Sequence, residues 1–447
     1  MKYQGWQRMS KETKKMAVPK LRFPEFKNAG NWSNESMEKL FDFLSTNSFS
    51  RDKLNYNMGT VKNIHYGDIH TKFKTLFKLQ KEVVPFINES ESIERIKPEC
   101  YCAEGDMVFA DASEDLEDIG KSIELVDLNN EKLLSGLHTI LARPKEKTFA
   151  LGFSGYLFKS TPMRSQIQKE SQGAKVLGIS AKKMAKMSLL FPMDKKEQQK
   201  IADCLSSLDE LIITQGDKVD TLKNYKKGLL QQIFPQEGET VPKLRFPEFE
   251  TDGDWAETEL SKALIPDIRG TKKPSSNYLA LGIRSHGKGT FLKPDEDPKK
   301  NAMDTLFEVH ENDLIVNITF AWEGAIAVVK KEDHGALVSH RFPTYVFNSG
   351  IAIVDFFRYI IFSPRFVYNL GLISPGGAGR NRVMSKTDFL KLKVLLPKVK
   401  EQMKIAKVLI SLDELIVSED EKLNHLKGHK KGLLQQLFPF LDTKGDN

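Results

Sequence analysis

The chain has 447 residues, a net charge of +7 and a pI near 8.9, so it exceeds one ordinary domain and is mildly basic. No apolar run approaches the ~20 residues of a membrane span, and the amino-terminal segment lacks the apolar core of a secretory signal. Three cysteines form neither a disulfide framework nor a CxxC pair, which indicates free thiols and a cytoplasmic protein. We expect about two to four folding units, and the charge suits an anionic partner without deciding it.

The first motif in the chain is a nine-residue string at 18–26, Val-Pro-Lys-Leu-Arg-Phe-Pro-Glu-Phe, which returns unchanged at 241–249. Trp32 and Trp255 follow the two copies at the same offset of 223 residues. An internal repeat of this length predicts two halves that open on the same structural unit.

The segment after each copy differs between the halves. Residues 33–190 and 256–395 are almost unrelated in sequence, and short apolar runs in both alternate with Gly, Pro, Asn and Asp. This pattern predicts an α+β block in each half, with its own core. The predicted strands are 106–110, 121–126, 137–142, 313–318, 325–329 and 343–347, and the predicted helices are 160–170 and 354–362.

Each half then ends in a second repeated segment, 196–235 and 400–439, in which 25 of 40 residues are identical. Apolar residues recur at the 3.5-residue spacing of a coiled coil. Polar residues interrupt this seam only at Gln215 and Lys226, and at the equivalent Glu419 and Lys430. The predicted seam residues are Ile201, Leu205, Leu208, Ile212, Leu222, Leu229, Ile405, Leu409, Leu412, Ile416, Leu426 and Leu433.

These segments predict two long helices. Asp194 and Glu197 have the spacing of a capping box at the first helix start, and Pro235 and Pro439 mark the ends. About 39 residues at 1.5 Å each give a rod of roughly 58 Å. We expect the helices to pack antiparallel on each other, because two similar halves are related by a pseudo-twofold axis. The alternative is that each helix packs on the block of its own half.

Several loops in the variable blocks place basic and polar side chains beside glycines, which let a backbone approach phosphates and base edges closely. An isolated loop of this kind is more often a solvated turn, but loops in corresponding places of both halves favour nucleic-acid binding. The candidate DNA-binding residues are His65, Tyr66, Asp68, His70, Lys72, Lys175, Arg284, Ser285, His286, Lys288, Arg380, Asn381 and Arg382.

No catalytic or metal constellation is apparent in the sequence. It has no Walker A run, no GxGxxG between a strand and a helix, and no methyltransferase or nuclease motif. His65 and His70 lack a third ligand nearby, and we interpret Asp111 and Glu114 as surface charge.

The twin openings, the twin Ser-Leu-Asp-Glu-Leu-Ile and Lys-Lys-Gly-Leu-Leu-Gln-Gln helices and the two unlike blocks together resemble the specificity subunit of a type I DNA restriction-modification system. The resemblance covers nearly the whole chain. It implies two α/β-mixed target-recognition domains separated by two long antiparallel helices, reading a bipartite, asymmetric DNA site. It also implies no catalysis by this chain.

The same resemblance implies a bacterial or archaeal host-defence complex with two modification (methyltransferase) subunits and up to two ATP-dependent restriction subunits. S-adenosylmethionine, ATP and Mg would belong to those partners, so no cofactor is expected here. The predicted organisation is an extension at 1–17, target-recognition domain 1 at 18–192, spacer helix 1 at 193–235, target-recognition domain 2 at 236–397, spacer helix 2 at 398–440 and a tail at 441–447.

Two other function classes remain open from the sequence. A coiled-coil scaffold with two protein-binding heads would have the same helices, and only the variable loops distinguish it from a DNA reader. A standalone nuclease or methyltransferase is disfavoured because its motifs are missing.

Overall fold

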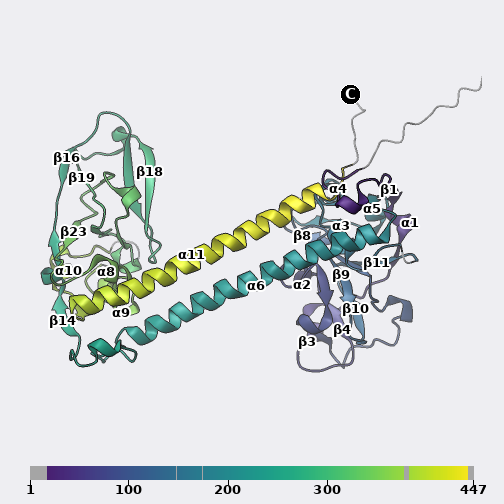
Figure 1. Cartoon of the computed structure of the whole chain (residues 1–447), viewed down its shortest axis with the longest axis horizontal. Coiled ribbons are helices and arrows are strands. Elements are labelled where there is room, and N and C mark those ends of the chain that lie inside the picture. The colour runs from purple at the N-terminus through teal and green to yellow at the C-terminus, as the bar shows by residue number, and fades with distance from the viewer. Residues whose placement is uncertain (1–17, 147, 174, 377–381, 441–447) are drawn as a thin grey trace, which may run out of the picture. The chain divides into compact units, whose positions relative to one another are not determined.

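The computed structural model describes residues 18–146, 148–173, 175–376 and 382–440. The chain divides into two compact units: unit 1 is Met1–Gly216 with Glu421–Asn447, and unit 2 is Asp217–Asp420. Two long helices, α6 (Lys195–Ile233) and α11 (Val399–Gln436), each contribute one half to each unit (Figure 1). The predicted extension at 1–17 and tail at 441–447 lie outside the described residues.

Unit 1 carries a globular part that we call head 1, residues 33–191, built on a five-stranded sheet of order β2-β11-β7-β9-β5 and a four-stranded sheet of order β10-β4-β6-β3. Two short pairs, β1-β13 and β12-β8, complete it. Its strands are β1 (Ser33–Ser36), β2 (Phe41–Leu44), β3 (Leu54–Asn55), β4 (Lys62–Ile64), β5 (Leu76–Lys78), β6 (Phe86–Ile87), β7 (Met107–Ala110), β8 (Ala112–Ser113), β9 (Ser122–Asp127), β10 (Leu133–Ser135), β11 (Thr139–Pro144), β12 (Leu177–Gly178) and β13 (Ser188–Phe191). Its helices are α1 (Met37–Leu40), α2 (Tyr66–Thr71), α3 (Phe153–Leu157), α4 (Thr161–Glu170) and α5 (Ala181–Ala185).

Unit 2 carries head 2, residues 256–396, with a four-stranded sheet of order β15-β23-β20-β21 and a five-stranded sheet of order β16-β19-β22-β17-β18. The pair β14-β24 closes it. Its strands are β14 (Ala256–Glu259), β15 (Leu264–Pro266), β16 (Gly270–Lys272), β17 (Tyr278–Ile283), β18 (Thr290–Glu296), β19 (Thr305–Glu308), β20 (Leu314–Val316), β21 (Ile326–Val328), β22 (Leu337–Val338), β23 (Thr344–Phe347) and β24 (Lys393–Leu396). Its helices are α7 (Leu260–Ala263), α8 (Val354–Ile360), α9 (Pro364–Leu372) and α10 (Lys386–Lys391).

The predicted fold class is confirmed: two mixed heads and two long helices. All six predicted strands are present, as β7, β9, β11, β20, β21 and β23, and the two predicted helices are α4 and α8. Strands β7 and β20 are apolar throughout because both faces of their sheet are covered. Met107 and Phe109 face the core that α3 and α4 complete, whereas Val108 and Ala110 face the core of the second sheet.

Within each unit, the segment of α6 and the segment of α11 run antiparallel to each other, as predicted. In unit 1 Lys430 of α11 forms an ion pair with Asp209 of α6, and in unit 2 Lys226 of α6 pairs with Asp413 of α11. Lys226 and Lys430, two of the polar interruptions of the seam, are therefore cross-helix contacts.

The helix ends also pack on the heads, so the predicted choice of helix on helix is only partly right. Ile201 and Leu205 belong to the core of head 1, and Ile405 and Leu409 to the core of head 2. The apolar seam at each helix start therefore packs on the head, while further along α6 Val219 is also buried.

The repeated opening motif clamps each helix start. The Arg22 guanidinium donates two hydrogen bonds of 2.7 Å to the Glu197 carboxylate, and Trp32 Nε1 donates one of 3.2 Å. Asp194 caps α6 by accepting from Lys196 N at 2.8 Å. The capping box prediction is therefore wrong for Glu197, whose carboxylate turns to the opening motif instead.

Unit 2 repeats this clamp with Arg245, Trp255 and Glu401, at 2.9, 2.7 and 3.3 Å. Backbone contacts also match: Leu21 N donates to Gln436 O at 3.0 Å in unit 1, and Leu244 N donates to Gln232 O at 2.9 Å in unit 2. The repeated sequence thus encodes one structural frame, used twice.

Candidate nucleic-acid interface

Three segments of head 1 meet at the end of strand β7: the loop 111–121, helix α2 and the described residues of the loop 171–179. His70 Nε2 of α2 lies 3.0 Å from Ala112 O, and Lys121 Nζ donates to His70 O at 2.6 Å. Ile179 N donates to Asp111 O at 2.9 Å. We call these three segments reading surface 1.

Head 2 has the same arrangement at the end of β20, from the loop 317–325, the β17–β18 hairpin 284–289 and the described residues of the segment 373–385. His286 N donates to Glu323 O at 2.7 Å, and Met384 N donates to Ile318 O at 2.8 Å. We call these segments reading surface 2. The hairpin occupies the position that α2 has in head 1, so the two surfaces share a place in the fold but not a structure.

Helix α2 begins at a histidine that serves as its cap. His65 Nδ1 accepts from Gly67 N at 3.1 Å, and Arg51 Nη2 lies 3.1 Å from the same nitrogen. Since a nitrogen that accepts from donors carries no proton, the neutral ring has its proton on Nε2. Burial and the charge of Arg51 lower the pKa of His65, so the ring is neutral at pH 7.

Asp68 lies beneath this surface. Its carboxylate accepts from Arg51 at 2.8 Å and pairs with Lys72 at 2.9 Å. Burial opposes ionisation, but the two cations outweigh it and hold the pKa of Asp68 below its usual value. Asp68 is only 1% exposed, so this placement does not support the predicted DNA contact and gives it the role of holding Arg51 and Lys72.

The exposed groups next to Asp68 are the hydrogen-bond donors Arg51 and Lys72, which both contact Tyr56. Arg51 donates to the Tyr56 hydroxyl at 2.9 Å, and Lys72 Nζ lies 5.7 Å from the Tyr56 ring centroid. About half of the Lys72 side chain and 47% of Tyr56 are exposed. Lys72 was predicted, whereas Arg51 and Tyr56 were missed because they come from a different loop and no motif marks them.

Aromatic rings extend the same surface. The Tyr66 ring centroid lies 4.7 Å from that of His65 and 5.3 Å from that of His138. His138 Nδ1 lies 3.2 Å from Asp111 Oδ1. His70 uses Nε2 within the fold, and its buried Nδ1 has no partner among the described residues. His138 was not predicted, since it fell within the predicted strand 137–142 and has no basic neighbour.

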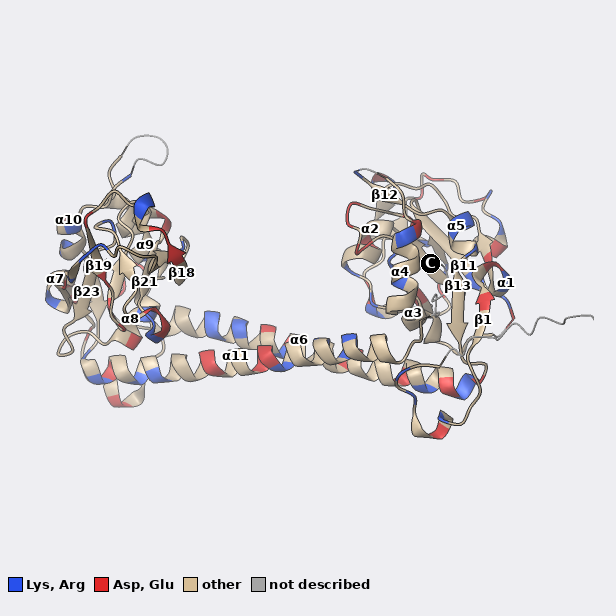
Figure 2. Cartoon of the chain, turned by 90° about the horizontal axis from the view of Figure 1, so that it is seen from above, with Lys and Arg blue, Asp and Glu red and all other residues tan. Residues whose placement is uncertain are grey.

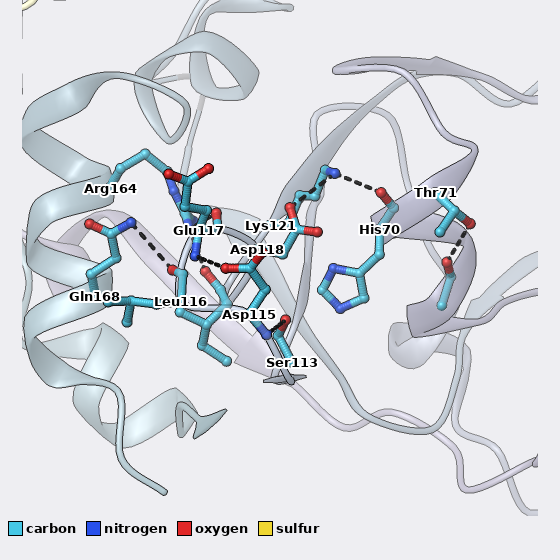
Figure 3. A network of polar contacts seen from close by, with 12 residues as sticks. His70, Thr71, Ser113, Asp115, Leu116, Glu117, Asp118, Lys121, Arg164 and Gln168 are labelled. Carbon is cyan, nitrogen blue, oxygen red and sulfur yellow. Dashed lines mark hydrogen bonds and ion pairs between the residues drawn. The ribbon is translucent and has the colours of Figure 1, made fainter. Parts of the chain in front are cut away.

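The loop 111–121 carries several carboxylates and is held from both sides (Figure 3). Arg164 of α4 donates to Glu117 O at 2.8 Å and to Ile119 O at 2.7 Å, while Lys121 connects the loop to α2. Glu114, Asp115 and Glu117 remain exposed. Such carboxylates can accept hydrogen bonds from the cytosine amino group, whereas they repel phosphates.

In reading surface 2 the hairpin carries basic residues and is held by contacts to Phe291 and Glu323. The Arg284 guanidinium lies 4.7 Å from the Phe291 ring centroid, and Ser285 Oγ donates to Glu323 at 2.8 Å. His286 has φ 60°, and Lys288 is exposed. The structure thus brings the four predicted hairpin residues together, although Ser285 points to Glu323.

The remaining predicted residues lie on the segment before α5 or α10. Lys175 is exposed, and the Arg382 guanidinium lies 5.2 Å from the Trp322 ring centroid of the adjoining loop. Arg380 and Asn381 lie outside the described residues. Trp322, which was not predicted, holds Arg382 against reading surface 2.

Both heads mix basic and acidic side chains rather than presenting one sign (Figure 2). Among the described residues, no group of three or more His, Cys, Asp and Glu side chains could hold a metal ion. In the described part of the chain, no helix is long and apolar enough to cross a membrane. The two surfaces offer hydrogen-bond donors, acceptors and aromatic faces, which suit recognition of base edges and phosphates.

The fold and these surfaces define a binding protein with two different reading heads on one repeated frame. The family model for the type I restriction modification DNA specificity domain matches residues 57–224. The chain is 26% identical over 349 residues to the putative type I restriction enzyme MjaX specificity subunit of Methanocaldococcus jannaschii, covering 75% of this chain and 77% of that relative. It is 23% identical over 304 residues to the MjaVIII specificity subunit of the same organism, covering 63% and 69%.

Two solved structures share the fold. The type I restriction-modification S subunit from M. genitalium gives a TM-score of 0.55 at 13% identity, over 95% of this chain and 100% of that chain. A chain from a structure on assembly and conformational transition of the type I R-M system gives 0.51 at 12% identity, over 90% and 96%. In sequence and fold the chain is thus similar to type I restriction-modification specificity subunits, and these findings support a role in DNA sequence specificity.

Proposed function

We propose that the chain reads a bipartite, asymmetric DNA site, one half through each head. The observation that carries this proposal is the substitution of a hairpin for helix α2 at the same position of a shared fold. Equal frames with unlike reading surfaces are suited to two unlike half-sites. The exposed Arg51 and Lys72 in head 1, and Arg284 and Lys288 in head 2, would supply the donors.

The proposed complex contains two modification subunits, which carry S-adenosylmethionine, and up to two restriction subunits, which use ATP and Mg. In this proposal the catalytic chemistry belongs to these partners. The complex would act in the cytoplasm. The exposed outer faces of α6 and α11, which carry both signs of charge, are the proposed docking faces for the modification subunits (Figure 2).

A reader exchange tests the modular part of this proposal. Residues 36–190 are replaced by the corresponding block of another specificity subunit, and methylated sites are mapped across the genome. We expect one half of the recognised sequence to change and the other half to persist. A change in both halves would contradict independent reading by the two heads.

A second measurement separates DNA reading from a purely protein-binding scaffold. The assembled methyltransferase complex is titrated with specific and scrambled duplexes over a salt series. We expect sequence preference together with a fall in affinity as salt rises, because phosphate contacts release counterions. Equal affinity for both duplexes at all salt concentrations would favour the scaffold.

A further inference from the structure

A tyrosine of head 1 meets both long helices at one point. The Tyr156 hydroxyl of α3 donates to Asp209 Oδ2 of α6 at 2.9 Å. Lys430 of α11 pairs with the other oxygen of the same carboxylate, and its Nζ lies 5.6 Å from the Tyr156 ring centroid. The lysine and the aspartate are 18% and 26% exposed, so the contact is partly shielded from water.

Head 2 makes the same contact in unit 2. Tyr359 of α8 donates to Asp413 Oδ2 at 2.9 Å, and Lys226 pairs with Asp413 while its Nζ lies 5.3 Å from the Tyr359 ring centroid. The helices exchange roles between the two contacts: α6 supplies the aspartate in unit 1 and the lysine in unit 2. We call the two sets joint 1 (Tyr156, Asp209, Lys430) and joint 2 (Tyr359, Asp413, Lys226).

The helix residues of the joints lie in repeated sequence, but the tyrosines lie inside the variable blocks. Around them the sequences Phe-Ser-Gly-Tyr-Leu-Phe-Lys-Ser at 153–160 and Phe-Phe-Arg-Tyr-Ile-Ile-Phe-Ser at 356–363 share the phenylalanine, the tyrosine and the serine at equal spacing. Phe153 and Phe356 contact the tryptophans of the two opening motifs, with ring centroids 6.4 and 5.8 Å apart. A short helical turn in each block thus carries a docking sequence for the frame.

The contacts of each joint depend on direction, so they restrain the orientation of the head as well as its position. A hydrogen bond to a charged carboxylate is directional and is stronger than a neutral one. The lysine above the ring adds a cation–π contact, which requires the ring to keep its orientation. The core contacts of the helix starts fix where a head attaches, and the joint fixes how it is turned about that attachment.

We propose that joints 1 and 2 are positioning devices that hold each head at one orientation on its helix segments and thereby set the half-site spacing that the subunit accepts. This inference rests on the proposed function, because spacing has meaning only for a bipartite site. A head released from its joint keeps its reading surface and its base preference. It then accepts spacers that the intact subunit rejects.

The test uses the full complex with its modification subunits and duplexes whose spacer is lengthened or shortened by one or two base pairs. Lys430→Glu places two carboxylates together in joint 1, and Lys226→Glu does the same in joint 2. We expect each variant to reduce discrimination between the native and neighbouring spacings by about tenfold, while base preference within each half is kept. Tyr156→Phe keeps the ring and the packing, and should give a smaller loss in the same direction.

The matched control is Lys223→Glu, which reverses a charge facing Asp420 across the same helix pair but touches neither tyrosine. It should leave spacing preference unchanged. The exchange Asp209→Lys with Lys430→Asp restores opposite charges but removes the acceptor of the Tyr156 hydroxyl, so it should recover only the part of the discrimination that the ion pair provides.

Joint variants that assemble and melt normally, yet keep the native spacing preference, would overturn the inference. Recovery of stability without recovery of spacing in the exchanged pair would do the same, because it would make the joint merely structural. A native complex that shows no preference for any bipartite duplex would instead overturn the proposed function.

Discussion

Each head contains an equivalent four-strand arrangement, but different segments cover the end of this sheet in the two heads. In head 1 the order β2-β11-β7-β9 corresponds to β15-β23-β20-β21 in head 2, and the turns before β7 and β20 both place an aspartate, Asp106 or Asp313, against an arginine. The second sheets differ in strand number and order. The shared sheet therefore packs on the frame, whereas the segments that cover its end, and the second sheet, differ between the heads.

Removing the arginine of the clamp should have the largest effect on stability, and the effect should be equal in both units. Arg22→Ala leaves the Glu197 carboxylate, 1% exposed, without its main partner, and we expect a loss of about 3–5 kcal/mol from the stability of unit 1. Arg245→Ala should cost unit 2 the same. Chemical denaturation followed by proteolysis within each unit measures both. Clearly unequal losses would mean that the two frames are not equivalent.

Glu124 should make unit 1 sensitive to pH in a way that unit 2 is not. Burial raises its pKa to about 7, against two hydrogen bonds from Gly152 N and Gly155 N that lower it. The folded state therefore holds this proton more tightly than the unfolded chain, whose carboxyl has a pKa near 4.5.

This contribution is present below pH ~4.5 and is lost as the pH rises toward 7, at about 1.4 kcal/mol per pKa unit. Glu124→Gln should flatten that part of the stability profile, even if the amide loses one hydrogen bond. Melting curves between pH 5 and 8 would show it. An unchanged slope in the variant would assign the dependence to another group.

The reading surfaces should respond separately. Arg51→Ala should weaken recognition of one half-site by about 1–3 kcal/mol, because it removes a donor and takes away one partner of Asp68 and of His65. Arg284→Ala should weaken the other half-site by a similar amount. Binding of duplexes mutated in one half at a time measures the division. If either variant weakened both halves equally, the assignment of surfaces to halves would be wrong.

Lys159 and Phe362 occupy equivalent positions, three residues after the two joint tyrosines. We expect this pair to cause the smallest difference in stability between the units. Burial, with the charges of Lys430 and Lys121, lowers the pKa of Lys159 to about 8. The charged form is thus disfavoured in the folded state, and stability rises as the pH increases from 8 toward 10.5. Lys159→Met should stabilise unit 1 by about 1 kcal/mol at pH 7 and remove this rise, as thermal melts can show.

The repeats and periodicity were sufficient to predict the frame, the two long helices and the main strands. They did not reveal the clamp, because the arginine and the glutamate that form it are 175 residues apart in sequence. The joint tyrosines were hidden inside blocks that otherwise share little sequence. On the surfaces, Lys72 and Arg284 could be proposed from glycine-rich loops, but Arg51, His138 and Trp322 come from other segments that only the fold brings together.

The backbone bond from Leu21 to Gln436 is the counterpart of the bond from Leu244 to Gln232, although residues 233–243 join only the second pair directly. The same backbone contact is therefore made once across a direct connection and once without one. The polypeptide could begin with either half and still form both contacts. A permuted chain that opened between residues 237 and 240, with a linker of similar length between Phe440 and Val18, would keep every contact described within each unit.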